Sequence, residues 1–146
     1  MGDEDGGSAR FVVPVRDPKN AHLVRPGQQL PADLVAAQLA LHEVPLVSLD
    51  EAVPGRADFL KIDVEGAEEA VWRGMQRLIA RSPGVGIVME FNPLRCRDAR
   101  GVLAEMEARF PLREVTFAGT AVPCRPEEVL GRHEDTILYL SDAEPA

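Results

Sequence analysis

Apolar and polar residues fall into clear blocks in the second half of the chain. Short apolar runs at residues 58–63 and 85–91 predict two strands that are covered on both faces. Apolar residues at helical spacing follow each run and predict helices over residues 67–79 and 99–110. Two more strands are expected over residues 112–117 and 136–140, with a proline-containing loop between them. This order of elements indicates an α/β fold.

The first half of the chain carries weaker signals. Residues 9–14 are expected to form a short strand, and prolines and a glycine break any long element between residues 16 and 31. Residues 32–42 are compatible with a helix or with a loop packed on the sheet. Residues 45–49 are expected to form a short edge strand.

The junction after the first strong strand holds the most informative residues. Asp63 and Glu65 fall where that strand ends, and Gly66 lets the backbone turn sharply into the following helix. Glu90 ends the next strand along the chain. In open α/β sheets, ligands bind outside the carboxyl ends of the strands, so we expect these three carboxylates to face one crevice.

Two interpretations of these carboxylates stay open from spacing alone. As catalytic groups, Asp63 and Glu65 would accept the proton of a substrate hydroxyl or position it, or would bind a divalent cation with Glu90 as a third ligand. As structural groups, Asp63 would accept hydrogen bonds from loop amides, Glu65 would cap the helix, and Glu90 would pair with an arginine such as Arg95. No His or Cys spacing indicates a dedicated metal centre.

Four further residues receive structural interpretations. Glu68 is expected to be a solvated acid in the first helical turn. Asp50 is interpreted as a turn residue or as a hydrogen-bonding group near the same edge, Trp72 as a residue that packs on the flank of the helix, and His133 as a loop residue.

Composition limits the classes of partner. The chain has 146 residues, which we interpret as a single domain over residues 1–146, and a formal net charge of −8. That charge disfavours nucleic acid and anionic membrane surfaces as partners. No apolar run is long enough to span a bilayer, no signal peptide is visible, and Cys96 and Cys124 are read as reduced thiols, so a cytoplasmic location is expected.

A family resemblance adds to this interpretation. The K-I-D-V-E-G-A-E run at residues 61–68, together with residues 49–51 and 87–90, resembles the FkbM family of S-adenosylmethionine-dependent methyltransferases. The likeness is closest over residues 44–92. It implies S-adenosyl-L-methionine as cofactor and methylation of a hydroxyl on a small molecule, sugar, glycan or polyketide. It also implies catalytic roles for the carboxylates identified above, Asp63, Glu65 and Glu90.

The resemblance also implies a fold, namely a partial class I methyltransferase (Rossmann-like) sheet. Such a sheet has parallel strands and a C-terminal antiparallel hairpin, and its best-matching core here is residues 44–140. The N-terminal cofactor-binding strands and their glycine-rich turn are missing from this sequence. Its only G-x-G, at residues 84–86, precedes a strand instead of following one. The cofactor-binding residues are therefore unknown, and we expect weak binding of S-adenosylmethionine, or none, by this chain alone.

Without its first strand, the sheet is expected to have an open edge at residues 58–63 that recruits a partner. A homodimer or a complementary N-terminal half would cover that edge. Two functions follow as hypotheses. The first is an O-methyltransferase domain that is incomplete, and inactive, in this chain alone. The second is an inert half-domain that acts as an interaction module through its open edge.

Overall fold

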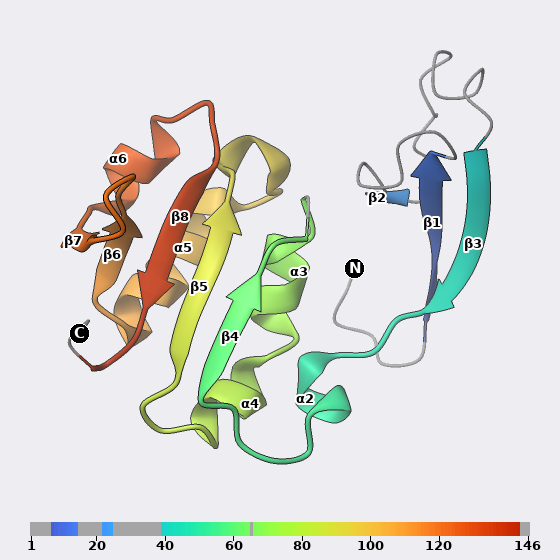
Figure 1. Ribbon diagram of the computed structural model, residues 1–146, viewed down its shortest axis with the longest axis horizontal. Coiled ribbons are helices and arrows are strands. Elements are labelled where there is room, and N and C mark those ends of the chain that lie inside the picture. The colour runs from blue at the N-terminus through green and yellow to red at the C-terminus, as the bar shows by residue number, and fades with distance from the viewer. Residues whose placement is uncertain (1–6, 15–21, 25–38, 65, 144–146) are drawn as a thin grey trace. The chain divides into compact units, whose positions relative to one another are not determined.

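The computed structural model describes residues 7–14, 22–24, 39–64 and 66–143. The chain divides into two compact units, one of Glu4–Val47 and one of Ser48–Ala146 together with Met1–Asp3. Each unit contains its own sheet (Figure 1).

The N-terminal unit is built on a three-stranded antiparallel sheet. β1 (Ser8–Pro14) is its central strand, and β2 (His22–Val24) and β3 (Leu39–Pro45) pair with it on either side. Val12 in β1 and Val24 in β2 are buried. The strand predicted over residues 9–14 is confirmed.

Two predictions for the segment before residue 50 are wrong where the structure describes it. Residues 39–42, expected to be helix or packed loop, belong to β3, and residues 32–38 lie outside the described residues. β3 pairs with β1 along its whole length, so cross-strand pairing overrides the local helical propensity. The edge strand expected over residues 45–49 is absent, because Pro45 ends β3 and Leu49 begins a short helix, α2 (Leu49–Ala52).

The C-terminal unit contains a five-stranded mixed sheet in the order β4-β5-β8-β6-β7. Its strands are β4 (Phe59–Ile62), β5 (Gly86–Phe91), β6 (Leu112–Val115), β7 (Ala121–Pro123) and β8 (Thr136–Leu140). β4 and β5 are neighbours and parallel, which confirms the pairing expected for residues 58–63 and 85–91. The other pairs are antiparallel.

The edge of this sheet opposite β4 contains two elements that the sequence analysis did not predict. β6 and β8 pair antiparallel, as expected. The segment between them, predicted to be a loop, forms the edge strand β7 and the helix α6 (Pro126–Leu130). Pro123 is tolerated in β7 because an outer strand need not donate from every N–H.

The helix predicted over residues 67–79 is two short helices, α3 (Glu68–Arg73) and α4 (Gln76–Ala80). The break follows from the docking of α2. The Gly74 carbonyl accepts a hydrogen bond from the Asp50 N–H at 2.9 Å, and a Cβ on Gly74 would lie 3.4 Å from the Ser48 side chain. The second helix, α5 (Ala99–Arg109), follows β5 and a 3₁₀ turn, η2 (Pro93–Arg95), as the periodicity predicted.

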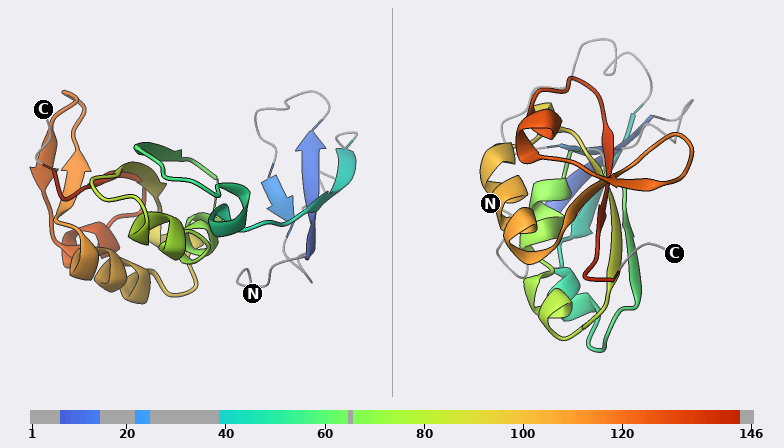
Figure 2. Two further views of the ribbon diagram at one scale, coloured as in Figure 1. Left: turned by 90° about the horizontal axis from the view of Figure 1, so that it is seen from below. Right: turned by 90° about the vertical axis from the view of Figure 1, so that its left-hand side faces the viewer.

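The helices α3, α4 and α5 lie on one face of the five-stranded sheet (Figure 2). The apolar core of this unit fills the space between that face and the helices. Its fully buried members include Trp72, Met75, Leu78, Ile87, Met89, Phe91, Leu103, Met106, Leu138 and Leu140. The structural interpretation of Trp72 is confirmed, because its side chain is buried and its indole N–H donates to Glu105 at 2.9 Å.

Both cysteines, Cys96 and Cys124, are free thiols, as predicted. Burial of Cys124, reinforced by the nearby negative charge of Glu114, raises the pKa of this thiol to about 11. Cys124 therefore stays protonated at neutral pH and is a poor nucleophile.

Candidate functional site

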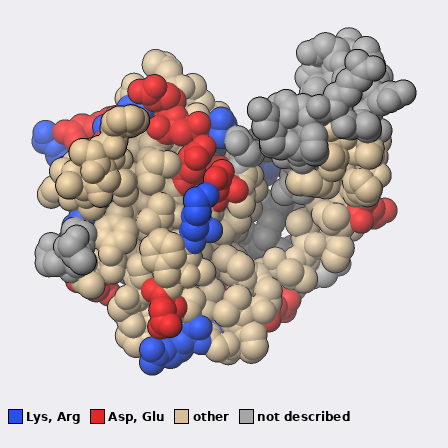
Figure 3. Space-filling model, viewed as in Figure 1, with Lys and Arg blue, Asp and Glu red and all other residues tan. Residues whose placement is uncertain are grey.

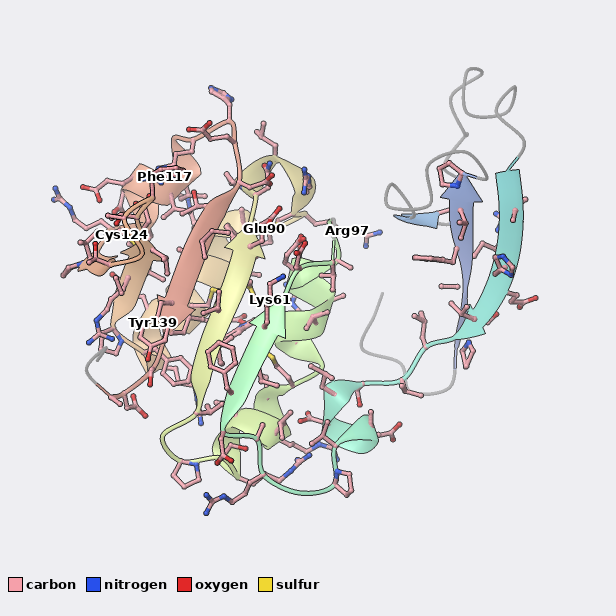
Figure 4. All side chains as sticks on the ribbon, in the orientation of Figure 1. Lys61, Glu90, Arg97, Phe117, Cys124 and Tyr139 are labelled. Carbon is pink, nitrogen blue, oxygen red and sulfur yellow. The ribbon has the colours of Figure 1, made fainter. Side chains whose placement is uncertain are left out.

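The carboxyl ends of β4 and β5 meet at one edge of the five-stranded sheet. Lys61 pairs in register with Val88, and Ile62 with Met89. Asp63 follows Ile62 and Glu90 follows Met89, so this register, continued by one residue, would set Asp63 next to Glu90. Figure 4 shows the Lys61 and Glu90 side chains on these neighbouring strands, on the face of the sheet turned away from the helices. The sequence prediction that Asp63 and Glu90 share an edge is consistent with this register.

The Asp63 carboxylate is exposed and forms an ion pair with Lys61, whose Nζ lies 2.7 Å from Oδ2. Lys61 precedes Asp63 by two residues, so both side chains point to the same face of the strand. In the described part of the chain, the partner of Asp63 is this ammonium group and not a set of loop amides. An exposed ion pair contributes little to stability, but it orients the carboxylate.

Glu68, which the sequence analysis expected to be solvated, forms a hydrogen bond within the turn between β4 and α3. Gly66 adopts a φ of 95°, which side chains other than glycine rarely tolerate, and its N–H donates to Glu68 Oε1 at 2.8 Å. Glu68 is 1% exposed, so its prediction as a solvated acid is wrong. Its side chain folds back under the turn instead of extending from the helix. Glu65, the third predicted site carboxylate, lies outside the described residues.

A second polar cluster lies at the same edge, where β8 begins opposite the end of β5. The Asn92 amide donates to Asp135 Oδ1 at 2.9 Å, and Arg95 lies 3.3 Å from the same oxygen. Arg95 thus pairs with Asp135. Sequence reasoning did not assign Asn92 or Asp135 to the site. The available signal was position alone, because Asn92 follows β5 directly and Asp135 precedes β8.

The middle of the face that carries Lys61 and Glu90 is uncharged, and charged groups gather at its upper and lower edges in the view of Figure 3. Phe59 is 59% exposed there, and Val88 and Tyr139 are half-buried beside it. Gly86 makes room for the aromatic pair, because a Cβ at this position would lie 3.2 Å from the Phe59 ring and 3.8 Å from the Tyr139 ring. Charged groups at the edge therefore adjoin an apolar surface.

Comparison with known proteins provides the family. The family model for the methyltransferase FkbM domain matches residues 7–117, about three quarters of the chain. The chain belongs to the FkbM methyltransferase family. The matched range includes β4, β5 and the turn with Asp63 and Gly66, and it ends in the connection between β6 and β7. No match was found among curated proteins or among solved structures.

In this FkbM-family chain, the segment after η2 is fastened to α3. Glu69 Oε2 accepts the N–H of Arg97 at 2.7 Å and that of Asp98 at 3.3 Å, while its other oxygen pairs with Arg73. Asp98 in turn caps α5 by accepting the Gly101 N–H. The Arg97 side chain is exposed at this edge (Figure 4). These contacts fix the backbone on the helix side of the candidate site.

Asp50 does not join this site. Its carboxylate accepts the N–H groups of Arg77 and Leu78 in the first turn of α4, at 3.1 and 2.5 Å, and it pairs with the Arg77 and Arg81 side chains. Asp50 is thus neither a turn residue nor a hydrogen-bonding group at the site edge, as the sequence analysis expected, but a residue of α2 that caps α4.

The described residues do not form a cradle for the cofactor that the family implies. Their strand–turn–helix with a glycine is β4–Gly66–α3, and there the Gly66 N–H donates to the buried Glu68 carboxylate instead of facing a ligand. Within the described ranges, no three His, Cys, Asp or Glu side chains are grouped as metal ligands. None of the described helices combines the length and apolar character that a bilayer-crossing segment needs.

Proposed function

We propose that this chain is the acceptor-binding part of an S-adenosylmethionine-dependent O-methyltransferase with a partial class I (Rossmann-like) sheet. The observation that carries the proposal is the parallel register of β4 and β5, which, continued by one residue, would set Asp63 next to Glu90 at the carboxyl edge of the two strands. The apolar face around Phe59 and Tyr139 adds a surface for the body of the acceptor. The acceptor class is a hydroxyl of a small molecule, glycan or polyketide.

The chemistry required from the chain is proton handling. A hydroxyl that attacks a methyl group must lose its proton, and a carboxylate within hydrogen-bond reach accepts that proton or orients the oxygen. Asp63 is our candidate base, with Lys61 fixing its direction. Glu90, one strand away on the same face, would hold the acceptor, and Glu65 is a further candidate from the same turn.

The methyl donor needs contacts that the described residues do not provide. We propose that a strand with a glycine-rich turn, paired in parallel with the outer edge of β4, supplies them. The chain alone is then expected to bind S-adenosylmethionine weakly or not at all in isothermal titration. A dissociation constant in the micromolar range for the isolated chain would contradict this division of roles.

The catalytic proposal is tested by Asp63→Asn in a complex that also contains the cofactor-binding segment. The amide keeps the shape but cannot accept the proton, so the rate of methyl transfer should fall by about 10²–10⁴-fold. Transfer of a radiolabelled methyl group to a panel of hydroxyl acceptors is the measurement. Glu107→Gln, on the exposed side of α5, is the control and should retain the wild-type rate. Equal rates for the two variants would mean that Asp63 is not the base and only forms its ion pair with Lys61.

A second candidate function is favoured by one observation, the position of β4 at the outer edge of its sheet. In this alternative the chain is catalytically inert and binds a polypeptide that adds a strand to that edge. The exposed ring of Phe59 supports such a role. Methyl transfer by the complex, lost in Asp63→Asn, would exclude the alternative.

A further inference from the structure

Glu68 is a carboxylate whose two oxygens have different surroundings. Oε1 accepts the Gly66 N–H at 2.8 Å, whereas Oε2 is buried and, among the residues that the structure describes, has no hydrogen-bond partner. The whole side chain is 1% exposed. A buried carboxylate with a single neutral donor is costly, because water no longer solvates the second oxygen.

Asp50 shows how this chain satisfies a buried carboxylate that serves stability. The Asp50 side chain is 8% exposed, and each of its oxygens accepts a backbone N–H from α4. Two arginines also lie beside it. Glu68 has no comparable set of partners in the described residues. An apolar side chain of similar size would avoid the cost of the unpartnered oxygen, so stability does not explain a carboxylate at this position.

The bond that Glu68 does form acts on the turn that carries the candidate site. Between Asp63, where β4 has ended, and Glu68, where α3 begins, the chain reverses through Gly66 at a φ of 95°. Lys61 holds Asp63 from the strand side, and Glu68 holds Gly66 from the helix side. The direction of the Asp63 carboxylate therefore depends on an anchor at each end of the segment.

We propose that Glu68 is a positioning residue, which fixes the β4–α3 turn through the Gly66 N–H so that Asp63 faces the acceptor. This inference rests on the proposed function, because it assigns Glu68 a role toward the base named there. A residue that anchors the turn affects local exchange at Gly66, whereas a residue that stabilises the fold affects the melting temperature, and the two can be measured independently.

The first measurement is amide hydrogen exchange at Gly66 in the full chain, together with the melting temperature. Glu68→Gln keeps an acceptor for the Gly66 N–H and should keep its protection. Glu68→Met removes the acceptor and should speed exchange at Gly66 by about tenfold. The melting temperature of Glu68→Met should stay within about 3 °C of wild type, because loss of the hydrogen bond is offset by removal of the unpartnered buried oxygen. Glu107→Met makes the same change at an exposed helical position and serves as the matched control.

The second measurement is methyl transfer in the complex used for Asp63→Asn. Glu68→Met should lower kcat by about 100-fold with a nearly unchanged KM for the acceptor, because a displacement of about 1 Å at the base is enough for such a loss. Glu68→Gln should restore most of the rate. A role in stability alone would make the rate follow the melting temperature in both variants.

Three outcomes decide the matter. Unchanged exchange at Gly66 in Glu68→Met would overturn the inference, and so would a large fall in melting temperature with a parallel loss of rate. Faster exchange with a preserved melting temperature and a lower kcat would support it. Absence of transfer by the wild-type complex would count against the proposed function instead, and the exchange and melting data would still show whether Glu68 anchors the turn.

Discussion

Asp50 joins α2 to both ends of α4 through one side chain. It lies in α2, accepts two backbone N–H groups of α4, and pairs with Arg81. The Arg81 guanidinium also donates to the backbone carbonyls of Asp50, Val53 and Gly55. The irregular connection between α2 and β4 therefore obtains its hydrogen bonds from side chains, where neither helix nor sheet can supply them.

Replacing Asp50 should consequently destabilise the fold. Asp50→Ala removes the cap of α4 and leaves two arginines without their carboxylate, so we expect a loss of about 2 kcal/mol in the free energy of unfolding. Urea denaturation followed by circular dichroism measures it. The neighbouring Glu51 is exposed, and Glu51→Ala should stay within about 0.5 kcal/mol of wild type. Similar values for the two variants would mean that the bonds of Asp50 contribute nothing net.

At the scale of single residues, the sequence predicted where side chains lie along the sheet edge better than it predicted which groups they contact. Asp63 and Glu90 could be placed at one edge because each follows a short apolar run, and strand ends of parallel neighbours coincide. Glu68 was misplaced because an acidic residue in a first helical turn is normally solvated. Its burial depends on the path of a turn around a glycine with positive φ, which the order of residues does not reveal.

Among the elements, β6 and the segment that precedes β8 are joined by the Glu114–Arg132 pair. Two parallel hydrogen bonds of 2.6 Å connect the guanidinium and the carboxylate, and both side chains are largely shielded from solvent. The hydrogen bonds from Arg132, reinforced by its charge, hold the pKa of Glu114 below its usual range against the opposing effect of burial. The same pair raises the pKa of Arg132.

This pair should make stability depend on pH in the acid range. Because the pKa of Glu114 is lower in the folded state, its contribution is complete above the unfolded value of about 4.3 and disappears as the pH falls through the folded value. Glu114→Gln should therefore lower the melting temperature by about 3 °C at pH 7, equivalent to about 1 kcal/mol, and the difference should narrow as the pH falls below the unfolded value.

Thermal unfolding of both proteins between pH 3 and 8 provides the test. Glu127→Gln, at an exposed position of α6, is the control and should follow wild type throughout. A gap between Glu114→Gln and wild type that stays constant across this pH range would show that the contribution of Glu114 is not electrostatic.

The elements with strong periodicity were predictable, and those that depend on docking were not. β5, α5 and β8 agree with the sequence analysis because buried faces impose their period on the residues. β4 lies where it was predicted, but it is not covered on both faces as expected, because Phe59 is exposed on the face without helices. The break between α3 and α4 depends on α2 packing against Gly74. β7 is a three-residue edge strand that contains a proline, so its pairing with β6 leaves almost no local signal.

At the scale of the whole molecule, the outer edge of β4 is the feature that we expect to decide whether the chain associates with another. β4 is the outermost strand on its side of the five-stranded sheet, and Phe59 presents an exposed ring beside that edge. Unpaired strand edges with apolar flanks tend to recruit another chain. When the segment proposed to pair with the outer edge of β4 is absent, a second copy of this chain can bind that edge instead.

Sedimentation velocity should accordingly show concentration-dependent self-association of the isolated chain. Phe59→Glu places a charge on the edge strand and should shift the protein to monomer with little change in melting temperature, because the ring is 59% exposed. Phe117→Ser is the matched control. That ring is fully exposed but lies in the β6–β7 connection, so its loss should leave association unchanged. A monomeric wild-type chain at high concentration would contradict the prediction.

The central place of β8 has a consequence for how the protein is made. β8 follows β5, β6 and β7 in the sequence, yet it separates β5 from β6 and pairs with both. During synthesis, the ribosome must release residues 136–140 before the two halves of this sheet acquire their common neighbour. Until then β5 and β6 each expose an open edge, at a stage when nascent chains are prone to aggregate. A chain that stops before residue 136 would lack a central strand of this sheet and not a peripheral one.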